Sequence, residues 1–358
     1  ISVVDVMSDA SPIMISVVNW KKPYAITIGP RMEDGNYLGA VFTKVMINNE
    51  EKSEIIIFSL SPTDGTIKEI NKIRDVFCES FSLAFTTTHH PILVFITISG
   101  TLELWQINNG SELQQLASVP NAGSGILSIE VSDDNSMLAI ASQDSSVTLW
   151  SIDKIIDGAG HDSVLAILAG HRYKVKQAVF SPSGKLIASA GVDKTIKLWD
   201  VDAAIKEAKE NKDGKFVTNA IRGTLLGHEL GVNGVSFISE DKLCSSSWDK
   251  TIRLWSVDND ANTCKRLGKG ESKSSNQHSI GVFPCERLTS LLTHDRNIYS
   301  VSNTGVVQKW AVRDLSKIEL LGHTTAVWAV AMLPDNKYGL TGSISGDGSV
   351  IIWDLERG

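Results

Sequence analysis

The sequence predicts an all-β fold, a β-propeller of seven blades, and three observations support this class. A pattern of apolar, any, apolar, aromatic, any and apolar residues recurs seven times in the 358 residues, with its aromatic positions 43 to 56 residues apart. The segments around it alternate apolar and polar residues in short runs that end in turn-forming clusters, as antiparallel strands do. A self-similar unit of slightly more than 40 residues indicates a radial or stacked repeat, and four strands per unit correspond to a propeller blade.

The recurring segment marks one strand of each unit. Its aromatic residues are Phe58, Trp105, Trp150, Trp199, Trp255, Trp310 and Trp353. The clearest unit has three alternating runs, which are VKQAVFSP at 175–182, KLIASAG at 185–191 and KTIKLWDV at 194–201, and a fourth strand follows at 224–227. We expect one domain over 1–358, with blades at approximately 14–71, 72–118, 119–169, 170–227, 228–270, 271–321, and 322–358 together with 1–6.

The two ends of the chain predict how the last blade is completed. Only three residues follow VIIWDL at 350–355, so the seventh blade lacks an outer strand. At the other end, ISVVDV at 1–6 precedes MISVVNW at 14–20, which we assign to the innermost strand of the first blade. Because an unpaired blade edge would invite aggregation, we expect 1–6 to pair with 349–355.

Composition and charge restrict the partners and the compartment. A net charge of −7 and a pI near 5.7 argue against a phosphate-binding surface, so no direct nucleic-acid partner is expected. No apolar run approaches the roughly 18–20 residues of a membrane span, and four scattered cysteines form neither a disulfide framework nor a zinc pattern. We expect an intracellular protein of the cytoplasm or nucleus, without metal or cofactor, and the initial Ile suggests a piece of a longer chain.

The repeats resemble those of the WD40-repeat proteins over nearly the whole chain. The resemblance depends on Gly-His at 170–171, 227–228 and 322–323, on Trp-Asp at 199–200 and 353–354, and on an Asp six residues before the Trp in four units. The Asp/Trp pairs are Asp144/Trp150, Asp193/Trp199, Asp249/Trp255 and Asp347/Trp353. The motifs are weakest in the first, second and sixth units, where both the Gly-His and the Asp are missing.

The resemblance implies a buried hydrogen-bond network inside the better-preserved blades. Its members would be His171, Ser189, Asp193 and Trp199 in the fourth blade, His228, Ser245, Asp249 and Trp255 in the fifth, and His323, Thr341 or Ser343, Asp347 and Trp353 in the seventh. Ser, His and Asp are also the residues of hydrolytic triads. Because each set recurs once per blade, we assign it a structural role and predict no catalytic residue.

Two segments exceed what a minimal blade needs. Residues 31–53 are assigned to an enlarged connection between the second and third strands of the first blade, on the face called the top, packed either on the ring or on a partner. Residues 200–215 predict a helix with Asp202 as N-cap and Gly214 as its stop. This helix would lie on the bottom face, as a solvated excursion or as a docking element.

Candidate partner-binding residues are those that the propeller arrangement would place on the top face around the channel. They are Trp248, Trp328, Lys174, Lys176, Leu230, Asn233, Val192 and Phe81. Large aromatic residues are preferred interface anchors, although Trp328 could equally pack inside its blade. The lysines beside Trp248 and Leu230 favour a patch on the fourth and fifth blades that takes an apolar side chain next to an acidic one.

The sequence favours a non-enzymatic scaffold that presents its top face and rim to peptides or subunits of a multiprotein complex. Two alternatives remain open at this point. One is a substrate-receptor or sensor domain of a larger enzyme, such as a ubiquitin ligase or a nucleotide-switch protein. The other is a chromatin or histone-tail reader. No small-molecule substrate and no membrane partner are expected.

Overall fold

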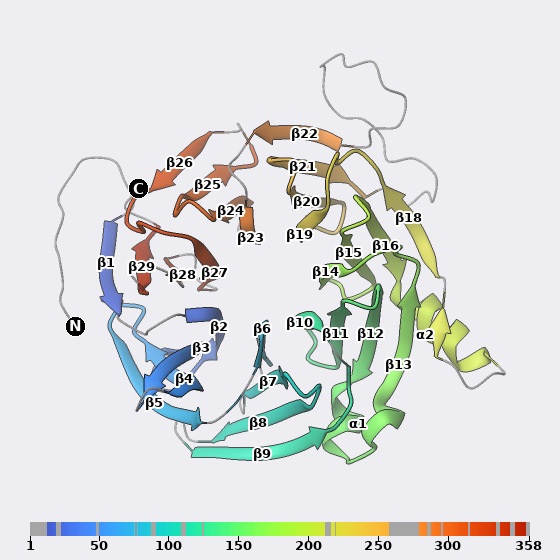
Figure 1. Ribbon diagram of the computed structural model, residues 1–358, viewed down its shortest axis with the longest axis horizontal. Helices are drawn as coiled ribbons and strands as arrows, with labels where there is room; N and C mark the ends of the chain where they lie inside the picture. Colours follow the sequence, from blue (N-terminus) through green and yellow to red (C-terminus); the bar gives the residue numbers. More distant parts are fainter. Residues whose placement is uncertain are drawn as a thin grey trace. The chain divides into compact units, whose positions relative to one another are not determined.

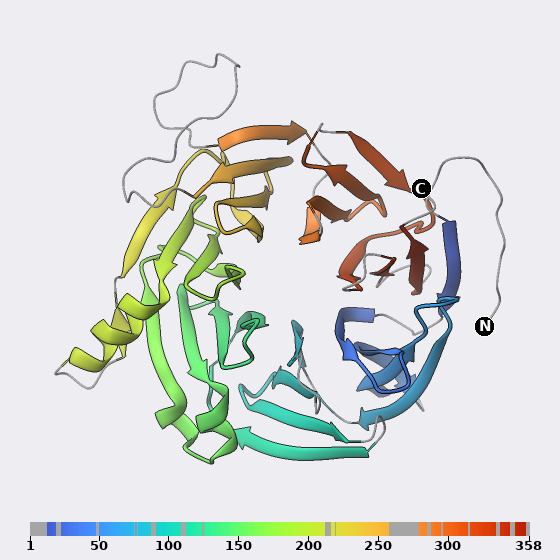
Figure 2. The ribbon, with the colours of Figure 1, turned by 180° about the vertical axis from the view of Figure 1, so that it is seen from behind.

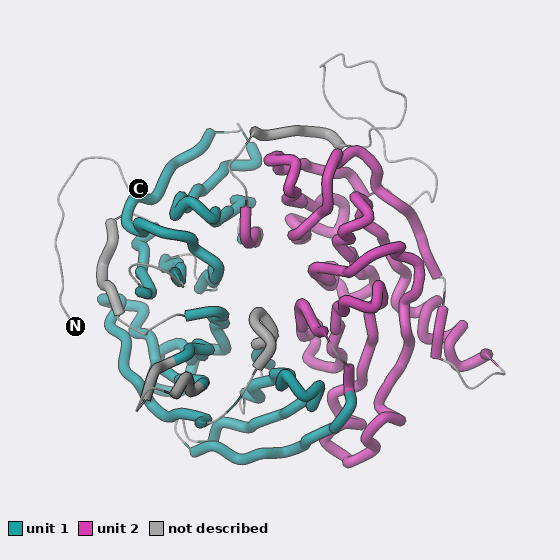
Figure 3. The backbone as a smooth tube through the Cα atoms, viewed as in Figure 1, with its two compact units in different colours: residues 1–121, 294–358 teal, residues 122–293 magenta. Residues whose placement is uncertain are grey.

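The computed structural model describes residues 13–18, 23–47, 50–74, 76, 78–86, 91–108, 112–123, 125–211, 216–218, 220–257, 279–284, 288–294, 296–313, 316–333, 337–343 and 348–355. Within these ranges only the backbone is described for 13–18, 45–47, 50–52, 78–83 and 279–284. The chain divides into two compact units, residues 1–121 with 294–358, and residues 122–293 (Figure 3). The sheets have four antiparallel strands, and one of them has a fifth strand added in parallel.

Three blades lie in the first unit. The first blade has the order β2 (Pro23–Arg31), β3 (Tyr37–Ile47), β4 (Glu50–Leu60), β5 (Ile67–Arg74). The second has β6 (Cys78–Phe85), β7 (Ile92–Thr97), β8 (Leu102–Asn108), β9 (Glu112–Val119). The seventh has β27 (Val327–Met332), β28 (Tyr338–Ser343), β29 (Val350–Asp354), with β1 (Ile13–Val18) as its fourth strand.

Three further blades lie in the second unit. The third has β10 (Ile126–Val131), β11 (Met137–Ser142), β12 (Ser146–Ser151), β13 (Val164–Ala169), with β17 (Val217–Thr218) added in parallel. The fourth has β14 (Val175–Phe180), β15 (Leu186–Gly191), β16 (Ile196–Asp200), β18 (Ile221–Leu225), and the fifth has β19 (Val232–Ser239), β20 (Lys242–Ser247), β21 (Thr251–Ser256), β22 (Ser279–Pro284). The sheet of the sixth blade is β23 (Leu288–His294), β24 (Asn297–Ser302), β25 (Val307–Ala311), β26 (Lys317–Leu320).

Seven sheets with this strand order are the blades of a β-propeller, so the predicted all-β class and blade number are confirmed (Figure 1). The N-terminal strand also completes the last blade, because β1 pairs antiparallel with β29 in a register that places Val18 opposite Val350. The strand that does so was predicted wrongly. Ile13–Val18 occupies the position expected for residues 1–6, which lie outside the described residues.

This offset changes the interpretation of the first blade. Its first strand is β2, and residues 31–53 are not a loop, since they contain most of the hairpin of β3 and β4. Tyr37–Ile47 pairs with Glu50–Leu60 along eleven consecutive positions. The fifth blade likewise extends beyond the expected boundary at 270, because β22 is its fourth strand.

The segment after β16 forms α2 (Val201–Glu210). The side chain of Asp200, not that of Asp202 as predicted, caps it by accepting a hydrogen bond from the Ala203 amide at 2.9 Å. The helix is not a solvated excursion on all sides, since Ala204 and Ala208 are buried in a cluster with residues of β13. Figures 1 and 2 both show α2 beside β13 in the second unit. The short α1 (Ile152–Ile156) and the 3₁₀ turn η1 (Gly160–Ser163) connect β12 to β13.

Two backbone features recur among the blades and fix where side chains point. In six blades a residue with positive φ lies five positions before the Trp, namely Gly100, Ser145, Lys194, Lys250, Gly305 and Gly348. In five blades the first strand has a register shift at its second residue, namely Tyr24, Leu127, Lys176, Asn233 and Trp328. Such bulges re-aim a side chain at the end of a strand, and all five of these side chains are half-buried.

Candidate interaction surface

The turn between the second and third strands of the fifth blade is held by His228 and Asp249. The imidazole Nδ1–H donates to Asp249 Oδ2 at 2.7 Å, and the same oxygen accepts from the Glu229 amide at 2.9 Å. On the other side of the ring, His228 Nε2 lies 2.8 Å from Ser245 Oγ, which also accepts from Trp255 Nε1 at 2.8 Å. The network therefore ties the connection before the first strand to the second and third strands.

The fourth blade repeats this geometry. His171 Nδ1 lies 2.9 Å from Asp193 Oδ2, and its Nε2 lies 2.7 Å from Ser189 Oγ. The Trp199 indole donates to Ser189 Oγ at 2.8 Å. Ser189 and Ser245 are both fully buried, so neither hydroxyl can reach a substrate, although the order of atoms resembles that of a hydrolytic triad.

Burial and hydrogen bonding set the charge states of the network. Burial alone would raise the pKa of the Asp193 and Asp249 carboxyls. Each carboxylate accepts hydrogen bonds from the His of its blade, from the backbone amide after that His and from a Thr side chain. These bonds outweigh the effect of burial and hold each pKa well below its usual range. Burial lowers the pKa of His228 even though Asp249 opposes this change. A neutral imidazole has one donor nitrogen and one acceptor nitrogen. In His228, Nδ1–H donates to the Asp249 carboxylate, and Nε2 is left to accept from the Ser245 hydroxyl.

The seventh blade keeps part of the set. His323 Nε2 lies 2.8 Å from Thr341 Oγ1, which accepts from Trp353 Nε1 at 2.7 Å. Thr341, not Ser343, is therefore the hydroxyl between the two rings, while Ser343 contacts Thr325. Asp347 lies outside the described residues.

Trp248 is positioned by the turn that this network stabilises. Trp248 comes directly before Asp249, and its amide donates to the Gly231 carbonyl at 3.0 Å. A Cβ on Gly231 would lie 2.9 Å from the indole and 3.3 Å from the Cα of Val192. The indole therefore packs over Gly231 beside Val192, and the close approach requires a glycine. Trp248 and Val192 are both partly exposed.

Leu230, Lys174 and Lys176 lie at or just before the starts of the first strands of the fifth and fourth blades. Leu230 is 47% exposed, and its carbonyl accepts from the hydroxyl of Ser247, the residue before Trp248. The Lys174 carbonyl accepts from the Val192 amide, and the Lys174 ammonium donates to Gln143 Oε1 at 2.9 Å. We call Lys174, Lys176, Val192, Leu230 and Trp248 the Trp248 patch; all lie in the second unit.

The lysines give the Trp248 patch a positive character. Lys176 is the bulged residue of β14 and is half-buried. Burial lowers its pKa, and the positive charge of Lys174 lowers it further. A carboxylate beside both ammonium groups would offset this repulsion.

The remaining predicted residues have other placements. Asn233 uses its side chain inside the protein, since its amide donates to the Leu288 carbonyl at 2.7 Å and accepts from Ser246 Oγ at 3.1 Å. Trp328 lies on β27 in the first unit and is half-buried. Phe81 lies on β6, in the part of this strand for which only the backbone is described.

Sequence reasoning missed one exposed aromatic residue. Tyr173 is 62% exposed and lies two residues after His171, as Leu230 lies two residues after His228. The sequence signal that could have identified Tyr173 is this position, two residues after a Gly-His pair, which it shares with the exposed Leu230.

The described residues contain no group of three or more His, Cys, Asp or Glu side chains arranged to hold a metal ion. Their helices are all too short or too polar to cross a bilayer.

Comparison with known proteins identifies a family model and several curated proteins that are similar to these repeats. The family described as "WD domain, G-beta repeat" (WD40) matches residues 113–151, 162–200, 220–256 and 315–354. Similar curated proteins include "Ribosome biogenesis protein WDR12 homolog" of Oryza sativa subsp. japonica, 25% identical over 62% of this chain and 52% of that protein, and "Ribosome biogenesis protein ytm1" of Emericella nidulans, 28% identical over 72% and 55%. The "WDR12 homolog" of Nematostella vectensis is 26% identical over 71% and 60%.

The chain thus spans between half and three fifths of the length of these relatives. The matched repeats contain the three indole-bearing strands with a Gly-His and Asp motif, and each match spans the fourth strand of one blade and the first three strands of the next. The chain therefore contains WD40 repeats, which match four regions of its seven-bladed β-propeller.

Proposed function

We propose that this chain is a non-enzymatic interaction subunit of a multiprotein complex that assists ribosome biogenesis, and that it binds a protein partner through the Trp248 patch. The relatives named above are ribosome biogenesis proteins, which supports the process. The observation that carries the binding site is the Trp248 indole, held over Gly231 beside Val192.

The chemistry of the patch selects one kind of partner segment. Trp248, Val192 and Leu230 offer apolar surface, and buried aromatic anchors provide much of the binding energy of protein interfaces. Lys174 and Lys176 favour carboxylates over cations. The expected segment therefore carries a large apolar side chain next to Asp or Glu, and a lysine-rich histone tail would be repelled from this patch.

The test uses the full-length protein tagged in its own cells. We expect it to sediment partly with pre-ribosomal particles in a sucrose gradient and to recover a defined set of assembly proteins under mild purification. The Trp248→Ala and Lys176→Glu variants should each fail to recover at least one of these proteins. The first removes the apolar anchor, and the second removes a positive charge that pairs with the partner's carboxylate.

The matched control is Lys185→Glu. Lys185 is exposed and lies at the other end of the fourth blade, in the connection between its first and second strands. Unchanged recovery with Trp248→Ala would contradict the assigned patch. Sedimentation only as free protein, with no precursor ribosomal RNA recovered, would contradict the assigned process.

A further inference from the structure

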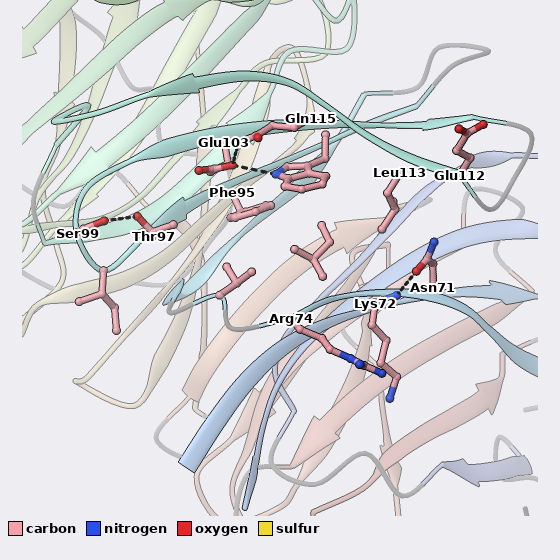
Figure 4. A pocket seen from close by; sticks show the side chains of 14 residues that line it. Asn71, Lys72, Arg74, Phe95, Thr97, Ser99, Glu103, Glu112, Leu113 and Gln115 are labelled. Carbon is pink, nitrogen blue, oxygen red and sulfur yellow. Dashed lines mark hydrogen bonds between the residues drawn. The ribbon is translucent and has the colours of Figure 1, made fainter. Parts of the chain in front are cut away.

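A pocket of about 960 Å³ lies in the first unit, between β5 of the first blade and β7, β8 and β9 of the second (Figure 4). Ile73 and Phe95 line it and are buried, and Ile98, at its edge, is 55% exposed. Trp105 and Leu113 line it from the second blade and are half-buried. Concave apolar sites of this size with a few polar groups are typical of ligand-binding sites.

Trp105 differs from every other repeat tryptophan. The indoles of Trp150, Trp199, Trp255, Trp310 and Trp353 are buried, whereas that of Trp105 faces the pocket. Its Nε1–H donates to Glu103 Oε2 at 2.9 Å, and the same carboxylate accepts from Gln115 and Ser118 on β9. The indole is thus held at the surface by a network of its own.

The cause of this difference is the residue ten positions earlier. Ser189, Ser245 and Ser300 occupy that position in the fourth, fifth and sixth blades and accept from the indole. In the second blade the position is Phe95, which has no acceptor. The Trp105 indole therefore turns to Glu103, two residues before it on the same strand.

The third blade shows what can cover such an indole. Ile140 replaces the Ser there, and Trp150 donates to Thr148, again two residues before it, at 3.0 Å. In that blade the insertion between the third and fourth strands places the ring of His161 at 6.0 Å from the Trp150 ring, and Trp150 is buried. The corresponding connection of the second blade has only three residues between β8 and β9, too few to form a similar insertion.

Four charged side chains line the pocket, the cations Lys72 and Arg74 and the carboxylates Glu103 and Glu112, and they differ in their partners. Lys72 pairs with Glu54 and Glu69 at 3.2 and 3.3 Å, and the Glu103 carboxylate already accepts three hydrogen bonds. Arg74 is exposed, and no ion pair holds it among the described residues. Its guanidinium is therefore available to a carboxylate from outside.

We propose that this pocket binds an extended peptide segment of a partner protein, whose large apolar side chain packs on Trp105 while a neighbouring acidic residue pairs with Arg74. The segment would cover Trp105 as His161 covers Trp150. This site lies in the first unit, shares no residue with the Trp248 patch, and does not depend on the proposed function.

The test is ¹⁹F NMR of the protein labelled with 5-fluorotryptophan, with the Trp105 resonance assigned from Trp105→Phe. Three synthetic pentapeptides serve as probes: Ser-Asp-Phe-Asp-Ser, the same peptide with Lys in place of Asp, and the same peptide with Ala in place of Phe. We expect only the first to shift the Trp105 resonance saturably. Arg74→Glu should weaken binding of the first peptide about tenfold or more, equivalent to about 1.4 kcal/mol. The variant should then bind the Lys peptide more tightly than the Asp peptide.

The matched control is Lys68→Glu, an exposed charge reversal on the same strand that does not line the pocket. It should bind as the unaltered protein does, and circular dichroism of each variant verifies the fold. The proposal is overturned if the Trp105 resonance does not move at millimolar peptide, or if Arg74→Glu leaves the preference unchanged. A dimer that Trp105→Ala converts to a monomer would assign the pocket to a second copy of the chain, which also overturns it.

Discussion

The indole of Trp255 and the hydroxyl of Ser245 are 2.8 Å apart, and the pair is repeated by Trp199 with Ser189 at the same distance. Each pair joins the third strand of a blade to the second, at a spacing of ten residues. Where the Ser is replaced by Phe95 or Ile140, the indole bonds along its own strand. The residue at this position thus decides whether the indole is hydrogen-bonded to the neighbouring strand or to its own strand, and the covering of the third blade decides whether it is then exposed.

Ser245→Ala should destabilise the protein considerably. It removes the acceptor of the Trp255 N–H and the partner of His228 Nε2, and each buried polar atom left unsatisfied costs about 1–3 kcal/mol. Thermal unfolding followed by circular dichroism should show a melting temperature lower by several degrees. Ser183→Ala, at an exposed turn of the same unit, should change it little, and equal melting of the two variants would contradict the role assigned to the network.

Much of the fold follows from periodicity. The aromatic anchors, the alternating runs and the Gly-His pairs are local signals, so the blade number and the all-β class could be predicted. The last strand could not be placed, because ISVV occurs at both 1–4 and 15–18. Both copies have the same strand pattern, and only the pairing of β1 with β29 distinguishes them.

The candidate sites were less predictable, for two physical reasons. The bulges that aim Lys176 and Asn233 are tertiary features of the backbone, with no residue type that marks them. The Trp105 pocket depends on what is missing from the second blade, an acceptor at Phe95 and a covering insertion. The missing acceptor is visible in the sequence, because the residue ten positions before the Trp is Ser in the fourth, fifth and sixth blades and Phe95 in the second.

Acidification should weaken the fifth blade in two stages. The pKa of His228 lies below its ordinary value of 6.5, so the unfolded chain binds the proton more tightly and stability falls as the pH drops below about 6.5. The pKa of Asp249 lies below its ordinary value of 3.8, so its contribution is present above 3.8 and is lost as the pH falls from there. The melting temperature of the unaltered protein relative to Asp249→Asn should therefore decrease below about pH 4; a constant difference down to pH 3 would contradict this.

Glu130 should act in the opposite direction. Burial raises its pKa to about 8, aided by Asp133, although its carboxylate accepts from the Phe180 amide at 3.1 Å. The folded protein therefore holds this proton more tightly than the unfolded chain, and stability falls as the pH rises from about 4.5 to 8, by at most about 1.4 kcal/mol per pH unit.

Glu130→Gln keeps an oxygen for the Phe180 amide and removes the ionisation. The variant should melt at a higher temperature than the unaltered protein at pH 8, and the two should converge near pH 5. Thermal unfolding over this range measures the difference. If the two proteins differ by the same amount at both pH values, Glu130 does not titrate with a raised pKa.

Gly231→Ala separates packing of the Trp248 patch from stability of the blade. The added Cβ would lie 2.9 Å from the Trp248 ring, closer than van der Waals contact allows, so the partly exposed indole should move while the buried Ser245 and Trp255 remain in place. Partner recovery under mild purification should fall as it does for Trp248→Ala, with a melting temperature close to that of the unaltered protein. Full partner recovery by Gly231→Ala would show that the position of this indole does not matter for binding, and a large loss of stability would show that the ring supports the blade instead.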